Sequence, residues 1–278
     1  MLGRIAIHLH HDVGCKRRLQ AAIQLATEHK AELIGIYPSD SASQYMHEDT
    51  VIPDEVHRVL KNHVDRERAE IKKLFLEQTA AAGIKAQWRT PRGAPDEALA
   101  LHSRFCDLLV MSKAENRDTV TSMVPNLPES VVMAAGRPVL MIPAVGQIPS
   151  IGKRILFCWD HRRESARAFL DAAPFLKGCT ELVVLTIDPD PENLRKKDVY
   201  ESDFADYCAS LGYPKPLQVV KDSEDFGVGN IILNSTTDYG SDLIIMGAYG
   251  HSRMRQWIMG GASRTLLSSM TVPIVLSH

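Results

Sequence analysis

The amino-acid sequence predicts an α/β protein built from two doubly wound, parallel-sheet units in tandem. Short apolar runs alternate with longer amphipathic stretches along the 278 residues. Within the runs the apolar residues are continuous, which is typical of strands that are covered on both faces. Strands that alternate with helices favour right-handed crossovers and an open parallel sheet. At roughly 150 residues per domain, the chain is long enough for two such sheets.

The two halves of the chain are copies of one unit of about 140 residues. Four pairs of segments match: 4–10 with 154–160, 32–37 with 181–187, 106–112 with 241–247, and 137–143 with 272–278. The offset is 150 residues in the first pair and 135 in the last two. Residues 143–152 are rich in Gly and Pro and are predicted to link the halves. The predicted domains are therefore residues 1–145 and 152–278.

Helical patterns fill the gaps between the apolar runs. Residues 17–30 follow the first run, and residues 164–176 follow its copy in the second half. Residues 53–82 form a long, charged, amphipathic stretch, and Gly83 just beyond it predicts a helix C-cap. The counterpart in the second half, near residues 191–211, is shorter. Each half is thus predicted to consist of strands joined by helices.

Composition and charge exclude several classes of protein. Lys and Arg number 32 against 34 Asp and Glu, a net charge of −2, so no basic excess is present for binding nucleic acid. No run approaches the ~18 apolar residues that a membrane helix needs, and the N-terminus lacks the pattern of a signal peptide. The five cysteines are an odd number without a C-x-x-C pair, which indicates reduced thiols and predicts a cytoplasmic protein.

The candidate ligand site lies in the second half. In an open α/β sheet, ligands bind beyond the carboxyl ends of the strands, where the strand order reverses. Gly247 and Gly250 follow an apolar run, and Gly260 and Gly261 come just before a helical stretch. Glycines allow backbone N–H groups to approach an anion, and the N-terminus of the following helix favours phosphate. The alternative interpretation is that these glycines only form turns.

With the spacing G-x2-G-x9-G, these residues resemble the nucleotide-binding motif of the universal stress protein family, G-x2-G-x9-G-[ST]. The resemblance covers both halves and identifies the chain as a tandem, two-domain member with Rossmann-like domains. It implies that the second half binds ATP, ADP or AMP, which Mg²⁺ can accompany, with Asp160 beside the adenosine and the glycines around the ribose and phosphates. The implied nucleotide-binding residues are Cys158, Trp159, Asp160, Ile187, Met246, Gly247, Gly250, His251, Gly260, Gly261, Ala262 and Ser263.

The motif also shows departures from the family. Gly261 stands where the family has Ser or Thr, so a hydroxyl donor to phosphate is missing unless Ser263 supplies it; Ser263 is otherwise a helix-capping hydroxyl. In the first half the three glycine positions are Ser112, Glu115 and Pro125, and a proline has no N–H to offer. The first half is therefore not expected to bind ATP in the same way.

Histidines near the first apolar run raise a metal hypothesis. His8, His10, His11 and Asp12 are side chains of the types that bind metal ions. The repeat explains two of these positions, because His10 stands in the place of the strand-end Asp160 and His8 in the place of a cysteine. Neutral histidines in a degenerate pocket are the preferred interpretation, and no metal site is predicted.

The resemblance implies a stress-response protein that senses or signals through its nucleotide, with no catalytic residues and at most slow hydrolysis. Two other classes stay open. One is a nucleotide-free interaction protein of the same fold, and the other is a slow ATPase or phosphotransferase, which would need Mg²⁺ and a residue to position water. In this family, domains pair edge to edge through their last strands, here residues 139–142 and 273–276. An internal pseudo-dimer is therefore expected, with a homodimer as a further option, and neither nucleic acid nor membrane is an expected partner.

Overall fold

The computed structural model describes residues 1–38, 54–113, 127–223, 226–248, 266–267 and 269–278. The chain divides into two compact units, Met1–Ile142 and Pro143–His278. Residues 143–152, which the sequence marks as a linker, belong to the second unit, where Ile151 is buried in the core. Among the described residues, no helix combines the length and the apolar character that crossing a bilayer requires.

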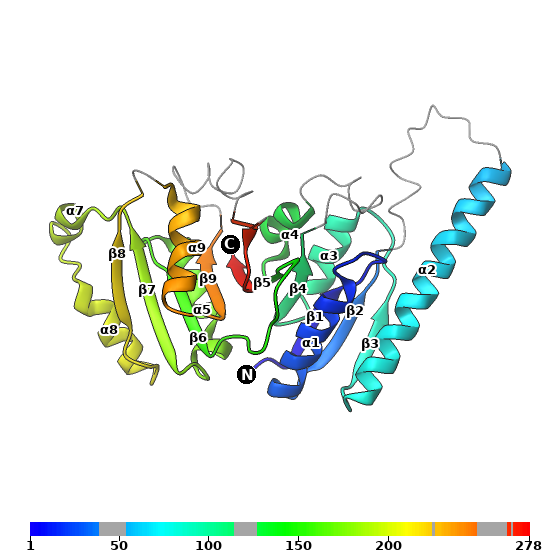
Figure 1. Cartoon of the computed structure of the whole chain (residues 1–278), viewed down its shortest axis with the longest axis horizontal. Coiled ribbons are helices and arrows are strands. Elements are labelled where there is room, and N and C mark those ends of the chain that lie inside the picture. Colours follow the sequence, from blue (N-terminus) through cyan, green and yellow to red (C-terminus); the bar gives the residue numbers. More distant parts are fainter. Residues whose placement is uncertain (39–53, 114–126, 224–225, 249–265, 268) are drawn as a thin grey trace. The chain divides into compact units, whose positions relative to one another are not determined.

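Unit 1 is built on a parallel sheet with the strand order β3-β2-β1-β4-β5 (Figure 1). Its strands are β1 (Arg4–His8), β2 (Glu32–Ile36), β3 (Ala86–Arg89), β4 (Leu108–Ser112) and β5 (Val139–Ile142). Its helices are α1 (Cys15–His29), α2 (Asp54–Ala81), α3 (Pro95–Ser103) and α4 (Leu127–Ala135). The chain runs outward from β1 to β3 and then returns to β4, so right-handed crossovers place α1 and α2 on one face and α3 and α4 on the other.

Unit 2 has the same arrangement, with the order β10-β9-β6-β7-β8. Its strands are β6 (Arg154–Cys158), β7 (Glu181–Ile187), β8 (Leu217–Lys221), β9 (Leu243–Gly247) and β10 (Ile274–Ser277). Its described helices are α5 (Arg163–Asp171), α6 (Ala173–Leu176), α7 (Pro191–Arg195), α8 (Glu201–Ser210) and α9 (Val228–Asp238). The predicted class, an α/β fold with two doubly wound parallel sheets, is confirmed.

The strand registers of the two units correspond residue by residue. Arg4 pairs with Glu32 in unit 1, and Arg154 pairs with Glu181 in unit 2. Likewise Ile5 pairs with Leu108, as Ile155 pairs with Leu243. Each residue of one sheet therefore has a defined counterpart in the other, and the two units can be compared position by position.

Two predicted helices are interrupted in unit 2. The stretch 164–176 breaks at Ala172, because Pro174 lacks an N–H and its ring clashes with the carbonyl four residues earlier in a continuous helix. The stretch 191–211 becomes α7 and α8 with a turn between them, in which Asp198 has a φ of +54°. In unit 1, α2 is continuous and lies beside β3, extending past it (Figure 1).

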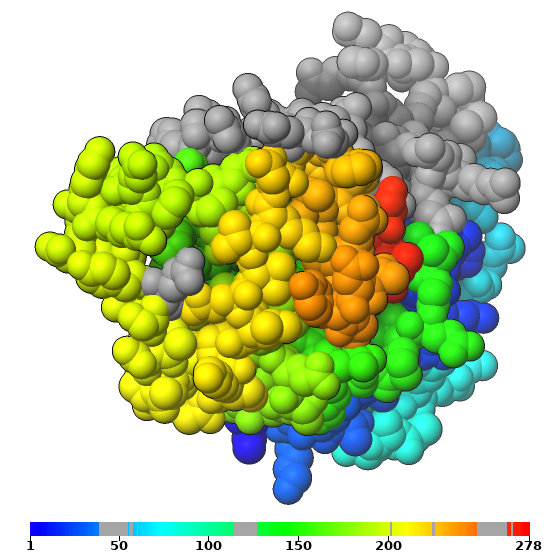
Figure 2. All heavy atoms as spheres, turned by 60° about the vertical axis from the view of Figure 1, so that its left-hand side comes forward, coloured from blue at the N-terminus to red at the C-terminus, as the bar shows by residue number. Residues whose placement is uncertain are grey.

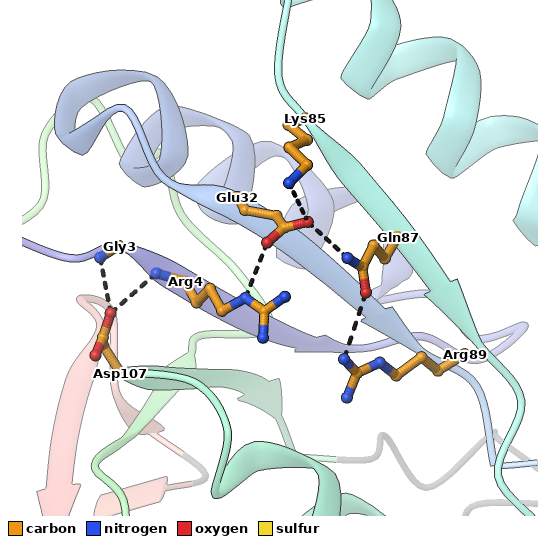
Figure 3. Close-up of polar contacts among 7 residues, drawn as sticks. All are labelled: Gly3, Arg4, Glu32, Lys85, Gln87, Arg89 and Asp107. Carbon is orange, nitrogen blue, oxygen red and sulfur yellow. Dashed lines mark hydrogen bonds and ion pairs between the residues drawn. The ribbon is translucent and has the colours of Figure 1, made fainter.

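An aspartate that precedes the fourth strand anchors the amino-terminal end of each sheet. In unit 1, Asp107 Oδ2 accepts hydrogen bonds from the Gly3 and Arg4 backbone N–H groups at 2.7 and 2.9 Å (Figure 3). In unit 2, Asp242 accepts them from three successive backbone N–H groups, those of residues 152–154, at 2.9 to 3.1 Å. The repeat thus extends to atomic contacts at this end of the sheet.

A second network at the same end joins β1, β2 and β3 of unit 1. Glu32 accepts hydrogen bonds from Arg4 Nε and Gln87 Nε2, both at 2.8 Å, and its carboxylate lies 3.4 Å from Lys85 Nζ (Figure 3). The Arg4 charge and hydrogen bond hold the pKa of the Glu32 carboxyl below its ordinary value. Both sets of contacts lie at the amino-terminal end of the sheet, opposite the carboxyl-terminal end where a ligand site is expected.

Candidate functional site

The order of strands in unit 2 reverses between β6 and β9, and the predicted site lies at the carboxyl ends of these strands. Six of the twelve predicted residues are described: Cys158, Trp159, Asp160, Ile187, Met246 and Gly247. The other six lie outside the described residues: Gly250, His251, Gly260, Gly261, Ala262 and Ser263. The described part of the site is thus the end of the sheet and the start of α5.

Asp160 is held against the first turn of α5. Its Oδ1 accepts hydrogen bonds from the Arg162 backbone N–H at 3.1 Å and from Ser165 Oγ at 2.7 Å. Its Oδ2 lies 3.7 Å from Arg162 Nε. One carboxylate oxygen therefore fixes the loop, and the other faces the Arg162 guanidinium. Ser165, which the sequence analysis missed, sets the orientation of this carboxylate.

Gly247 ends β9 where the strand packs directly on α5. A Cβ at this position would lie 2.5 Å from the Glu164 carbonyl carbon and 2.7 Å from the Ser165 nitrogen. The absence of a side chain therefore has a packing reason, in addition to the access to an anion that the sequence predicts. In unit 1 the small residue is on the other side of this contact: Gly14, the N-cap residue of α1, faces Ser112 on the strand, and these are the counterparts of Glu164 and Gly247.

In unit 1 an arginine fills the corresponding space. Arg18 is 1% exposed, and its Nε donates to the His8 carbonyl at 2.9 Å. Its two terminal nitrogens donate to Ser112 Oγ at 2.5 Å and to the Asp12 carboxylate at 2.9 and 2.6 Å. Burial raises the pKa of the Asp12 carboxyl, but the charge and hydrogen bonds of Arg18 outweigh it, and the net pKa is below the ordinary value. The counterpart of Arg18 in unit 2 is Ala168, so this position supplies no cation in unit 2.

The histidines of unit 1 are part of a buried aromatic stack. The rings of His8 and His10 are 6.3 Å apart, His10 stacks on Tyr37 at 5.7 Å, and Tyr37 lies 5.8 Å from Trp88. Burial and the Arg18 charge lower the pKa of His8 well below its ordinary value, so the ring is neutral. Among the described residues, no group of three His, Cys, Asp or Glu side chains is arranged to hold a metal ion.

The other described residues of the predicted site pack against their neighbours and provide no reactive group. Burial raises the pKa of the Cys158 thiol far above its ordinary value, so it is not a reactive thiolate. Met246 is 1% exposed, so its side chain belongs to the core. The Trp159 ring packs on Phe204 at 5.1 Å, and its Nε1 donates to His161 Nδ1 at 3.2 Å. Ile187, half-buried, ends β7.

The architecture is shared with solved structures. A universal stress protein from Archaeoglobus fulgidus DSM 4304 has a TM-score of 0.74 at 16% identity, over 99% of this chain and 95% of its own. A functionally unknown protein from Pseudomonas aeruginosa PAO1 has a TM-score of 0.57 at 12% identity, over 99% of this chain and 92% of its own. No protein-family model and no curated protein matches the sequence. At these identities the likeness establishes the fold, and the chain has the fold of a universal stress protein along its length.

Proposed function

We propose that the chain is a tandem universal stress protein that binds an adenine nucleotide, ATP, ADP or AMP, in unit 2 and serves as a nucleotide-dependent regulator in the cytoplasm. In this proposal unit 1 is a degenerate partner without a nucleotide. The chain is not an enzyme, or is at most a weak ATPase with Mg²⁺, because Asp160 is already committed to the loop and to the ligand.

The difference between the two units carries the proposal. In unit 1 the space beside the strand end is taken by the Arg18 guanidinium, which is neutralised by Asp12 and tied to Ser112. In unit 2 the same positions are Ala168 and Gly247, and Asp160 stands at the start of a nine-residue helix. The N-terminus of a helix offers free N–H groups and favours an anion. Among the described residues, unit 2 therefore has small side chains where unit 1 supplies its own cation, and this difference favours a phosphate in unit 2.

A nucleotide-free interaction protein is the second candidate. One observation favours it: the contact of Gly247 with the α5 backbone accounts for this glycine by packing alone. This candidate predicts the same fold without a bound nucleotide.

The first experiment identifies the ligand. Freshly purified protein is denatured, and the released small molecules are separated against adenine-nucleotide standards, before and after soaking with millimolar Mg-ATP. We expect close to one nucleotide per chain. A trace without nucleotide after soaking would reject nucleotide binding and leave the interaction protein as the function.

A matched pair of variants then places the nucleotide. Asp160→Ala is expected to weaken binding by about ten- to a hundredfold, since a hydrogen bond to a charged group contributes about 1.5–3 kcal/mol. Asp190→Ala is the control, because Asp190 also holds the start of a helix in unit 2, by accepting from the Asn193 backbone N–H at 3.1 Å. Equal affinities in the two variants would exclude Asp160 as a ligand-binding residue.

We also propose that β5 and β10 pair as the edges of an internal pseudo-dimer. Each is the last strand of its unit, and an open edge has unpaired N–H and C=O groups that pairing would satisfy. Hydrogen exchange on the full chain tests this, because pairing would protect the backbone amides on both edges of each strand. Rapid exchange of alternate amides would contradict it. Light scattering of the same sample measures whether a homodimer forms.

A further inference from the structure

Unit 2 contains a cavity of about 360 Å³ that the nucleotide proposal does not use. It lies between the ends of β7 and β8 on one side and α7, α8 and the loop before α8 on the other. In Figure 2, which turns this side of unit 2 forward, the surface is hollowed between the yellow-green atoms of α7 and α8 and the yellow atoms of β8. The volume is about twelve times the ~30 Å³ that one water molecule occupies in the liquid, and it falls within the range of small-molecule sites.

The internal repeat shows which side chains occupy the corresponding place in unit 1. By strand register, the counterparts of Tyr37 and Trp88 in unit 1 are Thr186 and Gln218, both of which line the cavity. In unit 1 the Tyr37 and Trp88 rings lie 5.8 Å apart, and Phe75 from α2 packs on Trp88 at 5.9 Å. Three rings thus fill the space between the sheet and its helix in unit 1. Two smaller side chains leave it open in unit 2.

Strained backbone surrounds the cavity. Three of the four described non-glycine residues with positive φ lie at its rim: His161 at 59°, Asp188 at 49° and Asp198 at 54°. His161 lines the cavity, and the other two directly precede the lining residues Pro189 and Val199. Asp188 is held in this conformation by hydrogen bonds from Ser223, at 2.9 Å from its N–H and 2.5 Å from its hydroxyl. Such strain persists where the surroundings enforce it, and it clusters at ligand sites.

The wall chemistry indicates the class of ligand. Most of the lining is apolar, including Leu194, Phe204 and Val220, and none of the lining residues is acidic. Two are basic, Arg195 and His161. The Arg195 guanidinium is exposed and forms no hydrogen bond or ion pair within the described part of the chain. An apolar cavity with a free guanidinium at its edge and no carboxylate suits an apolar anion better than a neutral or cationic molecule.

We propose that this cavity is a second binding site, which takes a small aromatic carboxylate. The aromatic body contacts the apolar walls between the sheet and α8, and the carboxylate is neutralised by Arg195. Thr186 brings a hydroxyl to the sheet side of the cavity. The cavity lies over β7 and β8, whereas most of the proposed nucleotide residues lie at the ends of β6 and β9. Ile187 directly follows the lining residue Thr186, and Trp159 packs on the lining residue Phe204, so a competition experiment tests whether the two sites are separate.

The test uses 2-naphthoate as the probe and calorimetric titration of the full-length protein. Gln218→Trp gives unit 2 the residue that fills the space in unit 1, and we expect it to weaken binding at least tenfold. Leu217→Trp is the matched control: it adds the same side chain at the neighbouring position of β8, which does not line the cavity, and is expected to change the affinity less than twofold. Absence of 2-naphthoate binding to the wild type at millimolar concentration would overturn the proposal, as would equal weakening by the two variants.

A second pair of variants tests the charge and does not alter the core. Arg195→Gln is expected to weaken 2-naphthoate by up to about fivefold, the range of an exposed ion pair, and to leave uncharged 2-naphthamide unaffected. Lys196→Gln, an equally exposed neighbour outside the cavity lining, is the control. Equal effects of the two substitutions on 2-naphthoate would contradict an Arg195 contact. If Gln218→Trp fails to fold, Arg195→Gln and Lys196→Gln still test whether 2-naphthoate binds in the cavity.

Competition with Mg-ATP separates this proposal from the proposed function. We expect 2-naphthoate to bind with the same affinity in the absence and in the presence of saturating Mg-ATP. One-for-one displacement of 2-naphthoate by ATP, together with loss of ATP binding in Gln218→Trp, would overturn the second site and make the cavity part of the nucleotide site. If the protein binds 2-naphthoate and no nucleotide, the proposed function fails and the carboxylate site is supported.

Discussion

Substitution of Arg18 by Met would leave a buried charge without a partner. The side chains of Arg18 and Asp12 are only 2% and 4% exposed, and three hydrogen bonds of the guanidinium end on the Asp12 carboxylate and Ser112. Removal of one member of a buried ion pair costs about 3–5 kcal/mol, because the other charge stays buried. For a unit of this size, we expect a decrease of ~10 °C or more in the melting temperature.

The double variant Arg18→Met/Asp12→Asn provides the internal control. Replacement of both charges costs much less than removal of one, so the double variant should recover most of the lost stability. Lys16→Met, an exposed residue in the same turn of α1, should be nearly neutral. Urea unfolding of the full chain is followed by hydrogen exchange of peptides from β1 and β4. Because both strands belong to unit 1, this measures the stability of unit 1 separately from that of unit 2.

The loss of stability in Arg18→Met is expected to depend on pH. In the wild type the pKa of Asp12 is depressed, so its contribution is present above the unfolded value of about 3.9 and is lost as the pH falls through the lower folded value. In Arg18→Met the same carboxyl is buried without a cation, its pKa rises, and protonation relieves the cost. The stability difference between the two proteins should therefore narrow between pH 7 and pH 4.5. A deficit below about 1 kcal/mol at pH 7, or one that does not change with pH, would refute a buried ion pair.

Three further outcomes are expected. Gly247→Ala should destabilise unit 2 by about 1–3 kcal/mol, because its Cβ would overlap the α5 backbone, and thermal unfolding without added ligand measures this packing cost separately from any effect on binding. Asp242→Asn should cost about 1.5–3 kcal/mol through weaker hydrogen bonds to the amino end of β6, and an unchanged urea midpoint would contradict the anchoring role. Because burial lowers the pKa of His8 well below its ordinary value in the folded chain, stability should fall as the pH drops below about 6.5, by up to ~1.4 kcal/mol per pH unit. His8→Leu should reduce this slope.

The sequence alone predicts the sheet of each unit because the apolar runs are continuous and duplicated. The interruption at Ala172 was also readable, since Pro174 stands inside the helical pattern. The turn at Asp198 was not, because an aspartate in the left-handed region carries no clear signal before the surrounding contacts are known.

The candidate site is less predictable than the fold. Asp160 can be predicted at the end of its strand, but its partner Ser165 depends on how the loop meets α5. Arg18 was missed because a charged residue in an amphipathic helix is ordinarily solvated, and only its pairing with Asp12 across the turn keeps it buried. Comparison of Arg18 with Ala168 at the repeat offset was the available signal. The cavity could not be foreseen either, because it follows from the size difference between Thr186 and Tyr37 in a shared register.

The reversed placement of the small residue constrains exchange between the two halves. Unit 1 has Gly14, the N-cap residue of α1, against Ser112 on the strand, and unit 2 has the α5 backbone at Glu164 against Gly247 on the strand. A hybrid that joined α5 to β4 would press the Ser112 side chain against the α5 backbone, and the reciprocal hybrid would place two glycines at this contact. Recombination between the duplicated segments is therefore expected to produce misfitting chimeras unless helix and strand are exchanged together.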